Sequence, residues 1–150
     1  MKTLNLNDLL KEWEQDCIID DKNLDEESKK TMRLHSKYLA KLQNHQIKLK
    51  YQISQVDILK KDLWLYYHGK LTKDQMDQKG WDYDPLGGIK IIKSDVNQFI
   101  ETDFHFVEEN TKCEYLKNIV DTLERIMNNI QWRHTHIKNI IEWKKFVSGA

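Results

Sequence analysis

Apolar side chains recur at helical spacing through residues 25–68, a stretch of 44 residues without proline or glycine. With Met32 placed at the first position of a heptad, eight of the eleven a and d positions are apolar or aromatic. The eleven positions are Met32, His35, Leu39, Leu42, Gln46, Leu49, Ile53, Val56, Lys60, Leu63 and Tyr67. Such a narrow apolar seam is typical of a long helix that packs on a partner helix. At about 1.5 Å per residue the helix would reach about 65 Å, so we expect another helix or another subunit to cover it.

The ends of this helix carry the expected signals. Asp25, Glu26 and Glu27 fall in the first turn, where the helix dipole favours anions. Gly69 follows Tyr66-Tyr67-His68 and is well placed as the C-terminal cap. The sequence therefore predicts one long helix that ends just before Gly69.

Shorter elements flank the long helix. A first short helix is predicted after Asn5 or Asn7, with its apolar face through Trp13. Residues 70–88 are polar and broken, and residues 89–93 could form a short strand that needs a partner, such as residues 81–83 or a neighbouring subunit. After a short helix that begins at Ser94, residues 104–147 form a second helical region, as two helices or one kinked helix.

The predicted fold is mainly α and consists of the long helix and C-terminal helices. A short β element near residues 81–92 is an alternative that the sequence leaves open. We expect one helical domain over residues 1–150. It is divided into N-terminal helices (1–68), a loop or short β segment (69–93) and C-terminal helices (94–147).

Charge is distributed in blocks, although the net charge is zero. Residues 31–70 carry eight basic and two acidic side chains, whereas residues 1–30 carry five and nine, and residues 71–110 carry four and nine. The basic block therefore lies on the long helix, behind its apolar seam. Lysine and arginine neutralise phosphates, and exposed aromatic rings stack on unpaired bases, so this pattern favours single-stranded nucleic acid. A merely solvated helix face is the alternative.

The candidate residues for single-stranded DNA fall into two groups. Tyr51, Tyr66 and Tyr67 are candidates for base stacking, and Trp64 is a further one; packing in the seam is the alternative for Trp64 and Tyr67. The electrostatic contacts are assigned to Arg33, Lys37, Lys41, Lys48, Lys60, Lys61 and Lys70.

Catalytic and metal-binding patterns are weak. Gly87-Gly88 is not followed by a phosphate-loop motif, and the carboxylates of Asp82 and Asp84 have no supporting histidine. His134 and His136 point about 200° apart on a helix and cannot share one ion. We therefore expect no enzyme, no metal site and no cofactor.

The cysteines and the hydropathy bear on the compartment. Cys17 and Cys113 fit two free thiols better than a disulfide. No apolar run of about 18 residues occurs, so we expect an intracellular protein that does not enter a membrane.

Four segments together resemble the UvsY family, the recombination mediators of T-even-type bacteriophages. They are Ile18-Ile19-Asp20 followed by Leu24, the segment 35–41, Lys61 followed by residues 66–69, and the tail 137–149. The resemblance covers about residues 8–150. One departure concerns the family's pair of basic residues before the two tyrosines: the first falls on Lys61 and the second on apolar Leu63, with Lys60 as a substitute.

The resemblance implies a protein that binds single-stranded DNA, forms a ring of six or seven copies and loads a RecA-like recombinase onto DNA covered by the phage single-strand-binding protein. It implies work in the cytoplasm of the infected bacterial host, in recombination, repair and recombination-dependent replication, without catalysis. The C-terminal helices carry self-association in the family. The matching interface residues here are Leu116, Ile119, Leu123, Ile126, Ile130, Ile137 and Ile141.

A different class of function also fits the sequence, namely a coiled-coil structural or assembly adaptor without nucleic acid. In that case the basic side chains of residues 31–70 would pair with the acidic blocks 1–30 and 71–110.

Overall fold

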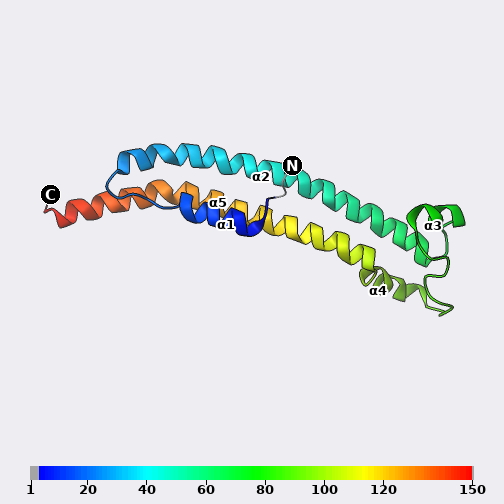
Figure 1. Ribbon diagram of the computed structural model, residues 1–150. Helices are drawn as coiled ribbons and strands as arrows, with labels where there is room; N and C mark the ends of the chain where they lie inside the picture. Colours follow the sequence, from blue (N-terminus) through cyan, green and yellow to red (C-terminus); the bar gives the residue numbers. More distant parts are fainter. Residues whose placement is uncertain (1–3, 150) are drawn as a thin grey trace. The chain divides into compact units, whose positions relative to one another are not determined.

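Helices make up every regular element of the computed structural model, which describes residues 4–149 (Figure 1). In chain order they are α1 (Leu6–Asp16), α2 (Leu24–Tyr67), α3 (Lys73–Lys79), the 3-10 helix η1 (Lys93–Asp95), α4 (Val96–Glu101) and α5 (Phe104–Val147). The predicted mainly α fold is confirmed, and the long helix begins and ends within one residue of the prediction. Residues 104–147, which the sequence left as two helices or one, form a single helix of 44 residues.

Side chains at the helix ends explain several of these boundaries. The side chain of Asn5 accepts a hydrogen bond from the Asn7 amide and caps α1. Thr72 and Gln75 form a capping box at the start of α3. The Asp103 carboxylate accepts a hydrogen bond from the His105 amide at 2.9 Å and so starts α5.

Two compact units make up the fold. Unit 1 comprises the residues up to Ile47 and those from Leu116 onward, and unit 2 comprises Lys48–Tyr115. Both long helices contribute to both units. The expectation of one helical domain stays a prediction.

Unit 1 combines α1 with the first part of α2 and the second part of α5, which run antiparallel (Figure 1). Tyr38 is fully buried because its ring meets the Trp13 ring edge-on and its hydroxyl donates to the Asp16 carboxylate at 2.9 Å. The core residues of unit 1 are Leu9, Leu34, Tyr38, Ile119, Leu123, Ile126 and Ile130. Leu9 is the residue by which α1 enters this core.

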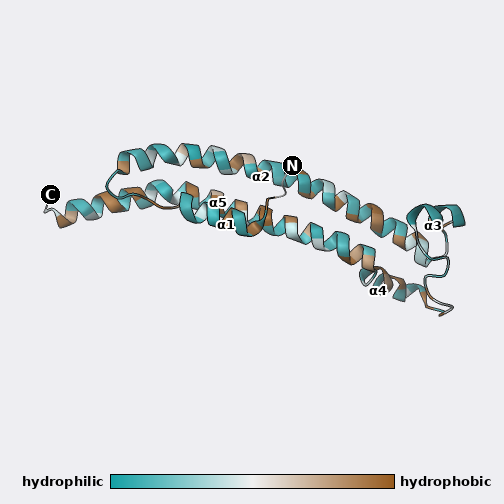
Figure 2. Cartoon of the chain, viewed as in Figure 1, coloured by the Kyte–Doolittle hydropathy of each residue, from teal (hydrophilic) through white to brown (hydrophobic). Residues whose placement is uncertain are grey.

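The apolar seam of α2 starts in a different register from the predicted one. Met32 is 71% exposed, whereas Leu34 and Tyr38 are buried. Leu42 packs against the core of unit 1, and Val56 and Leu63 are buried as predicted. Ile53 and Lys60, which the heptad also places in the seam, are exposed. Helix α1 explains the changed register, because Trp13 and Asp16 contact Tyr38 and bury this face of α2. In Figure 2, hydrophobic residues interrupt a largely hydrophilic α2 only at intervals, as a narrow seam requires.

Unit 2 has its own core at the end of α2. Its buried residues are Leu63, Tyr66, Met76, Val96 and Ile100. Leu59, Tyr67, Leu71, Trp81, Ile91 and Phe106 pack against them. α3 and α4 therefore serve as short covers that bury the last turns of α2.

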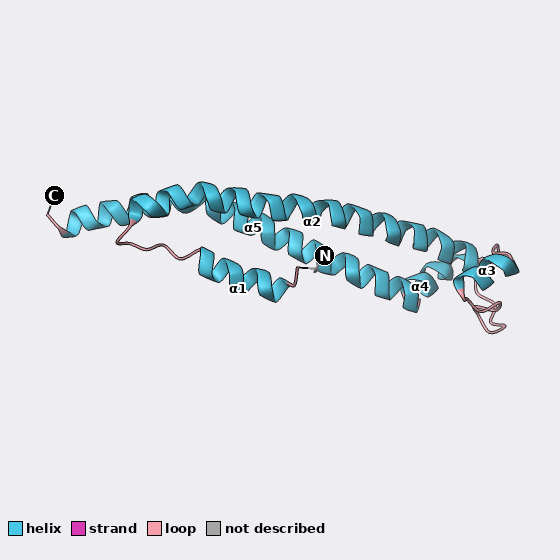
Figure 3. Cartoon of the chain, turned by 45° about the horizontal axis from the view of Figure 1, so that its top comes forward, coloured by secondary structure: helices cyan, strands magenta, loops and turns pink. Residues whose placement is uncertain are grey.

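The expectation of a strand over residues 89–93 is wrong. Residues 89–92 form an irregular segment before η1, and no strand occurs within residues 4–149 (Figure 3). Ile91 packs against the core of unit 2, while Ile89 and Ile92 are exposed. Ile91 thus anchors a loop to the core, and residues 89–92 do not pair with a second strand.

Most of the predicted oligomer interface lies inside the chain's own core. Ile119, Leu123, Ile126, Ile130 and Ile137 are each at most 5% exposed. Intramolecular packing uses their apolar surface, and their role in an interface between copies stays a prediction. Of the predicted set, Ile141 is 38% exposed and Leu116 is partly buried.

A helix that crosses a bilayer needs about 20 consecutive, mainly apolar residues. No helix in residues 4–149 is both long and apolar enough to cross a bilayer.

Candidate nucleic-acid interface

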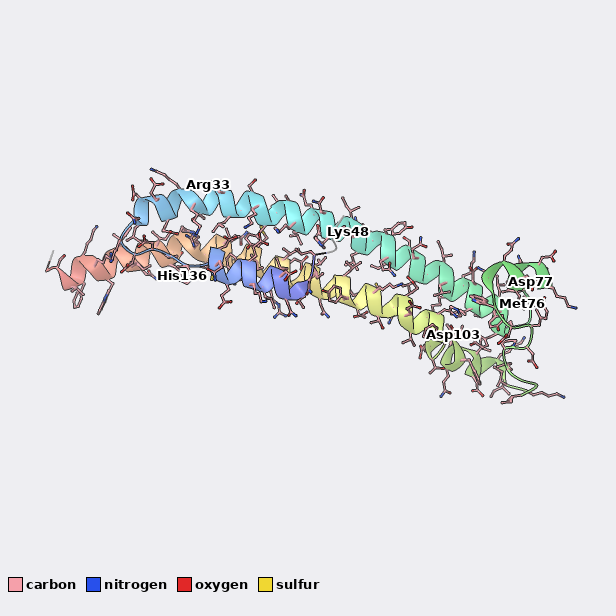
Figure 4. The ribbon with its side chains drawn as sticks, in the orientation of Figure 1. Arg33, Lys48, Met76, Asp77, Asp103 and His136 are labelled. Atoms are coloured by element: carbon pink, nitrogen blue, oxygen red, sulfur yellow. The ribbon has the colours of Figure 1, made fainter. Side chains whose placement is uncertain are left out.

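The predicted basic residues of unit 1 lie on one face of α2 and differ in their partners. Arg33 is exposed and carries no ion pair within the described residues (Figure 4). Lys37, one turn later, pairs with Glu12 at 2.8 Å and with Asp16 at 2.5 Å. Lys41 pairs with Glu12 at 2.8 Å. Two of the three cations are thus neutralised by α1, a pairing with the acidic block of residues 1–30 that the adaptor alternative predicts.

These contacts shift the titration of the partner groups. Burial alone would raise the pKa of the Glu12 carboxyl, but hydrogen bonds from Lys37 and Lys41 outweigh it and hold that pKa below its usual range. The pKa of the Asp16 carboxyl is likewise lowered: burial opposes the shift, and hydrogen bonds from Lys37 and Tyr38 produce it. Both carboxyls are therefore ionised at neutral pH.

A second cationic group lies at the C-terminal end of α2, in unit 2. Lys60 and Lys61 are exposed and make no ion pair within the described part of the chain. Trp64, one turn later, is 40% exposed. His68, one further turn along, lies against it, with ring centroids 4.0 Å apart and an interplanar angle of 32°. The spacing of three and four residues places these side chains on one face of the helix.

The turn after α2 adds a further cation to this face. Gly69 adopts a left-handed conformation with φ 66°, which favours glycine. The Lys70 amide donates to the Leu65 carbonyl at 2.8 Å, and the Gly69 amide donates to the Tyr66 carbonyl at 3.1 Å. This pair of bonds is a Schellman motif. It turns the chain back so that the Lys70 ammonium lies 4.6 Å from the centre of the Trp64 ring.

We call Lys60, Lys61, Trp64, His68 and Lys70 the Trp64 patch. An indole with a partly open surface and three surrounding lysines has the two components that single-stranded nucleic acid requires, a stacking surface and cations. Sequence reasoning named the lysines and considered Trp64, but it missed His68. The recurrence of Lys61, Trp64 and His68 at intervals of three and four was the available signal.

The departure at Leu63 has a structural reason. Leu63 is fully buried in unit 2 and cannot present a charge to a ligand in its place. Lys60 was assigned to the apolar seam, but Leu59 is the residue that packs against the core of unit 2, and Lys60 is exposed. Lys60 and Lys61 therefore provide two adjacent cations on the surface.

Tyr66 and Tyr67 point the other way, into unit 2. Tyr66 is 8% exposed, and its hydroxyl donates to the Asp82 carbonyl at 2.8 Å. The Tyr67 hydroxyl donates to the Asp103 carboxylate at 2.7 Å. Burial is the main cause that raises the pKa of both hydroxyls. Both rings are packed against protein groups of unit 2, and their base-stacking role stays a prediction.

The cavity beside these tyrosines is acidic. It has a volume of about 260 Å³ and is lined by Asp82, Asp84 and Asp103 together with Trp81 and His105. Carboxylates repel phosphates, so this side of unit 2 is unsuited to a nucleic-acid backbone. The Trp64 patch is the cationic face of the same helix end.

The two remaining predicted residues lie earlier in unit 2. Tyr51 is 67% exposed, and Lys48 is partly buried without an ion pair among the described residues (Figure 4). Their contact with DNA stays a prediction.

Two further features concern metal ligands and the two cysteines. Among residues 4–149 no group of three or more His, Cys, Asp or Glu side chains is placed to hold a metal ion. Cys17 is exposed and Cys113 is buried, and both are free thiols.

Comparison with known proteins gives one family and one fold. The family described as recombination, repair and ssDNA binding protein UvsY matches residues 12–150. A comparison with curated protein sequences finds no match.

Three crystal structures of the recombination mediator protein UvsY of bacteriophage T4 share the fold. The lattice type II structure has a TM-score of 0.83 at 23% identity and covers 97% of this chain and 99% of the other. The type IV structure has a TM-score of 0.79 at 20% identity and covers 95% and 98%. The type I structure has a TM-score of 0.79 at 23% identity and covers 93% and 98%.

Proposed function

The chain belongs to the UvsY family of recombination, repair and single-stranded DNA-binding proteins, and we propose that it is a phage recombination mediator that loads a RecA-like recombinase onto single-stranded DNA covered by a single-strand-binding protein. Under this proposal it acts in the cytoplasm of the infected bacterial host. It serves recombination, repair and recombination-dependent replication, and it performs no catalysis.

The Trp64 patch is the observation that supports this proposal most directly. Trp64 supplies a ring on which an unpaired base can stack, and such contacts tolerate any base. Lys60, Lys61 and Lys70 supply charge for the flanking phosphates. A mediator must hold strands of any sequence, so a site of stacking and charge without base-edge readout suits the role.

One such patch in one chain makes a small site. We propose that several copies, six or seven in a ring, present their patches to one strand, so that binding of the second patch becomes intramolecular. Sedimentation equilibrium gives the number of copies, and a monomer at micromolar concentration would contradict the ring.

Recombinase loading tests the proposed function itself. Single-stranded DNA is first saturated with the single-strand-binding protein, and filament assembly by the recombinase is followed with and without this chain. We expect the chain to shorten the lag before assembly. An unchanged lag, together with intact binding to bare single strands, would leave a DNA-binding protein that is not a mediator.

The adaptor function keeps one observation in its favour. Lys37 and Lys41 pair with Glu12 and Asp16, which belong to the acidic block of residues 1–30. That pairing is what a solely structural role for the basic side chains predicts. The adaptor function requires that single-stranded DNA fail to bind even at low salt, whereas the mediator function requires that it bind.

A further inference from the structure

Two carboxylates of α1 occupy the cations that a phosphate backbone would use in unit 1. Lys37 is held by both Glu12 and Asp16, and Lys41 is held by Glu12. These residues are 21 to 29 positions apart in the chain. The contacts are therefore a feature of tertiary structure and not of one helix.

The geometry of the two carboxylates resembles that of a short polyanion. Glu12 and Asp16 are four residues apart on α1, so they project from the same face of the helix about one turn apart. The cations that they meet, Lys37 and Lys41, have the same spacing on α2. A row of two negative groups thus faces a row of two positive groups.

The cationic row continues beyond α1. Arg33 lies one turn before Lys37 on α2, is exposed and has no ion pair within the described residues. Lys30 also contributes a favourable charge interaction to Asp16. A DNA strand could first contact the exposed Arg33. It would then reach Lys37 and Lys41, which already pair with the carboxylates of α1.

The ion pairs are exposed enough to exchange. Side-chain exposure is 38% for Lys37 and 27% for Lys41, against 32% for Glu12 and 22% for Asp16. Because solvent screens partly exposed pairs of this kind, each contributes little to the net stability of the fold. A phosphate can therefore replace a carboxylate here at small net cost, even though Leu9 and Trp13 hold the body of α1 against the core.

We infer that Lys37 and Lys41 form a second, latent phosphate-binding site, that Glu12 and Asp16 occupy it as an internal substitute for phosphate, and that the backbone of single-stranded DNA competes with them. This inference rests on the proposed function, because it concerns the same ligand. Helix α1 is then an intramolecular competitor of DNA. It lowers the affinity for single-stranded DNA and makes that affinity less dependent on salt.

The double variant Glu12→Gln, Asp16→Asn tests the inference. Both amides are close in size to the carboxylates, and the new amide oxygen at position 16 can still accept the Tyr38 hydrogen bond. The matched control is Asp8→Asn, Glu14→Gln, which changes the net charge equally on the same helix. Asp8 and Glu14 are exposed and make no ion pair in the described residues. Fluorescence anisotropy of a labelled single-stranded oligonucleotide is measured over a range of salt concentrations.

The two lysines should engage two further phosphates, so the slope of log affinity against log salt should steepen by about 1.4, or about 0.7 per phosphate on a single strand. Affinity at low salt should rise above that of the control variant. Glu12→Gln alone leaves Asp16 in place and should give about half of this gain. Adding Lys37→Ala and Lys41→Ala to the double variant should abolish it.

Two outcomes would overturn the inference. If the wild-type chain binds and the double variant matches its control, α1 does not compete with DNA, while the proposed function stands. If the gain survives Lys37→Ala and Lys41→Ala, it comes from net charge alone. Failure of every variant and of the wild type to bind would reject the proposed function and this inference together.

Discussion

The ammonium group of Lys70 lies over the indole ring of Trp64, 4.6 Å from its centre. The turn at Gly69 creates this contact, since it reverses the chain immediately after α2. A cation over an aromatic face is attracted by the ring. Under the proposed function, a base that stacks on Trp64 would displace this ammonium, which would then be available to a neighbouring phosphate.

Replacing Trp64 should weaken single-stranded DNA binding without unfolding the chain. Loss of one stacked base costs about 1–3 kcal/mol, which corresponds to about 5- to 150-fold in affinity. Trp64→Ala should show this loss, and Trp64→Phe should retain part of the affinity. Trp132→Ala is the matched control, because Trp132 is 56% exposed and belongs to unit 1. Equal affinities for Trp64→Ala and Trp132→Ala would remove Trp64 from the site.

Replacing the hydroxyl of Tyr67 should affect stability and leave DNA binding unchanged. Tyr67→Phe removes the 2.7 Å hydrogen bond to Asp103. A hydrogen bond to a charged group contributes about 1.5–3 kcal/mol, and urea unfolding should show a loss near the lower end. Affinity for single-stranded DNA measured on the folded variant should equal that of the wild type. A loss of affinity with unchanged stability would instead give the tyrosine a direct role in binding.

The buried ion pair of unit 1 gives a stability prediction independent of DNA. Arg133 is 4% exposed, pairs with Glu27, and donates to the Thr31 hydroxyl at 3.1 Å. Glu27→Ala leaves this guanidinium buried without its counter-ion, which should cost about 3–5 kcal/mol in urea unfolding.

Its control is Glu26→Ala, since Glu26 is 60% exposed and pairs with Lys29 at the surface. That change should cost about 0–1 kcal/mol. The double variant Glu27→Leu, Arg133→Met removes both charges and should recover much of the loss. Comparable destabilisation by Glu26→Ala and Glu27→Ala would show that the buried pair has no special weight.

The contacts between α1 and α2 should make stability depend on acid. The folded chain lowers the pKa of Glu12 and of Asp16, so these contacts contribute fully above the unfolded pKa values of about 4 and are lost as pH falls through the folded values. The urea midpoint of the wild type should therefore fall more steeply below about pH 5 than that of Glu12→Gln, Asp16→Asn. Parallel curves for the two proteins would contradict the lowered pKa values.

The sequence predicts the long elements well for a local reason. Residues 25–68 contain no helix breaker, and Gly69 supplies the left-handed cap, so the ends of α2 follow from short-range chemistry. The early register does not follow from it. Tyr38 is buried because α1 meets it, and a heptad pattern contains no information about a partner 22 residues away.

The residues of the candidate site also divide into those that local sequence predicts and those that depend on tertiary contacts. Lys61 and Lys70 could be identified as surface cations from the charge pattern alone, whereas the heptad places Lys60 in the apolar seam and only the structure shows it exposed. The burial of Tyr66 could not, because it depends on the Asp82 carbonyl and on the α3 residue Met76, both contributed by later chain segments. Pairing of Lys37 and Lys41 with α1 likewise requires the tertiary fold.

The most direct test of the central claim is the salt dependence of single-stranded DNA binding in Lys60→Ala, Lys61→Ala. We expect the wild type to bind single-stranded DNA with a steep salt dependence. Duplex DNA should compete poorly with the single strand for the protein. The slope of the variant should be shallower by about 1.4, at about 0.7 per phosphate. Lys11→Ala, Lys22→Ala, which removes two cations of the acidic N-terminal block, should leave the slope unchanged. Identical slopes for wild type and Lys60→Ala, Lys61→Ala would contradict the account of the Trp64 patch.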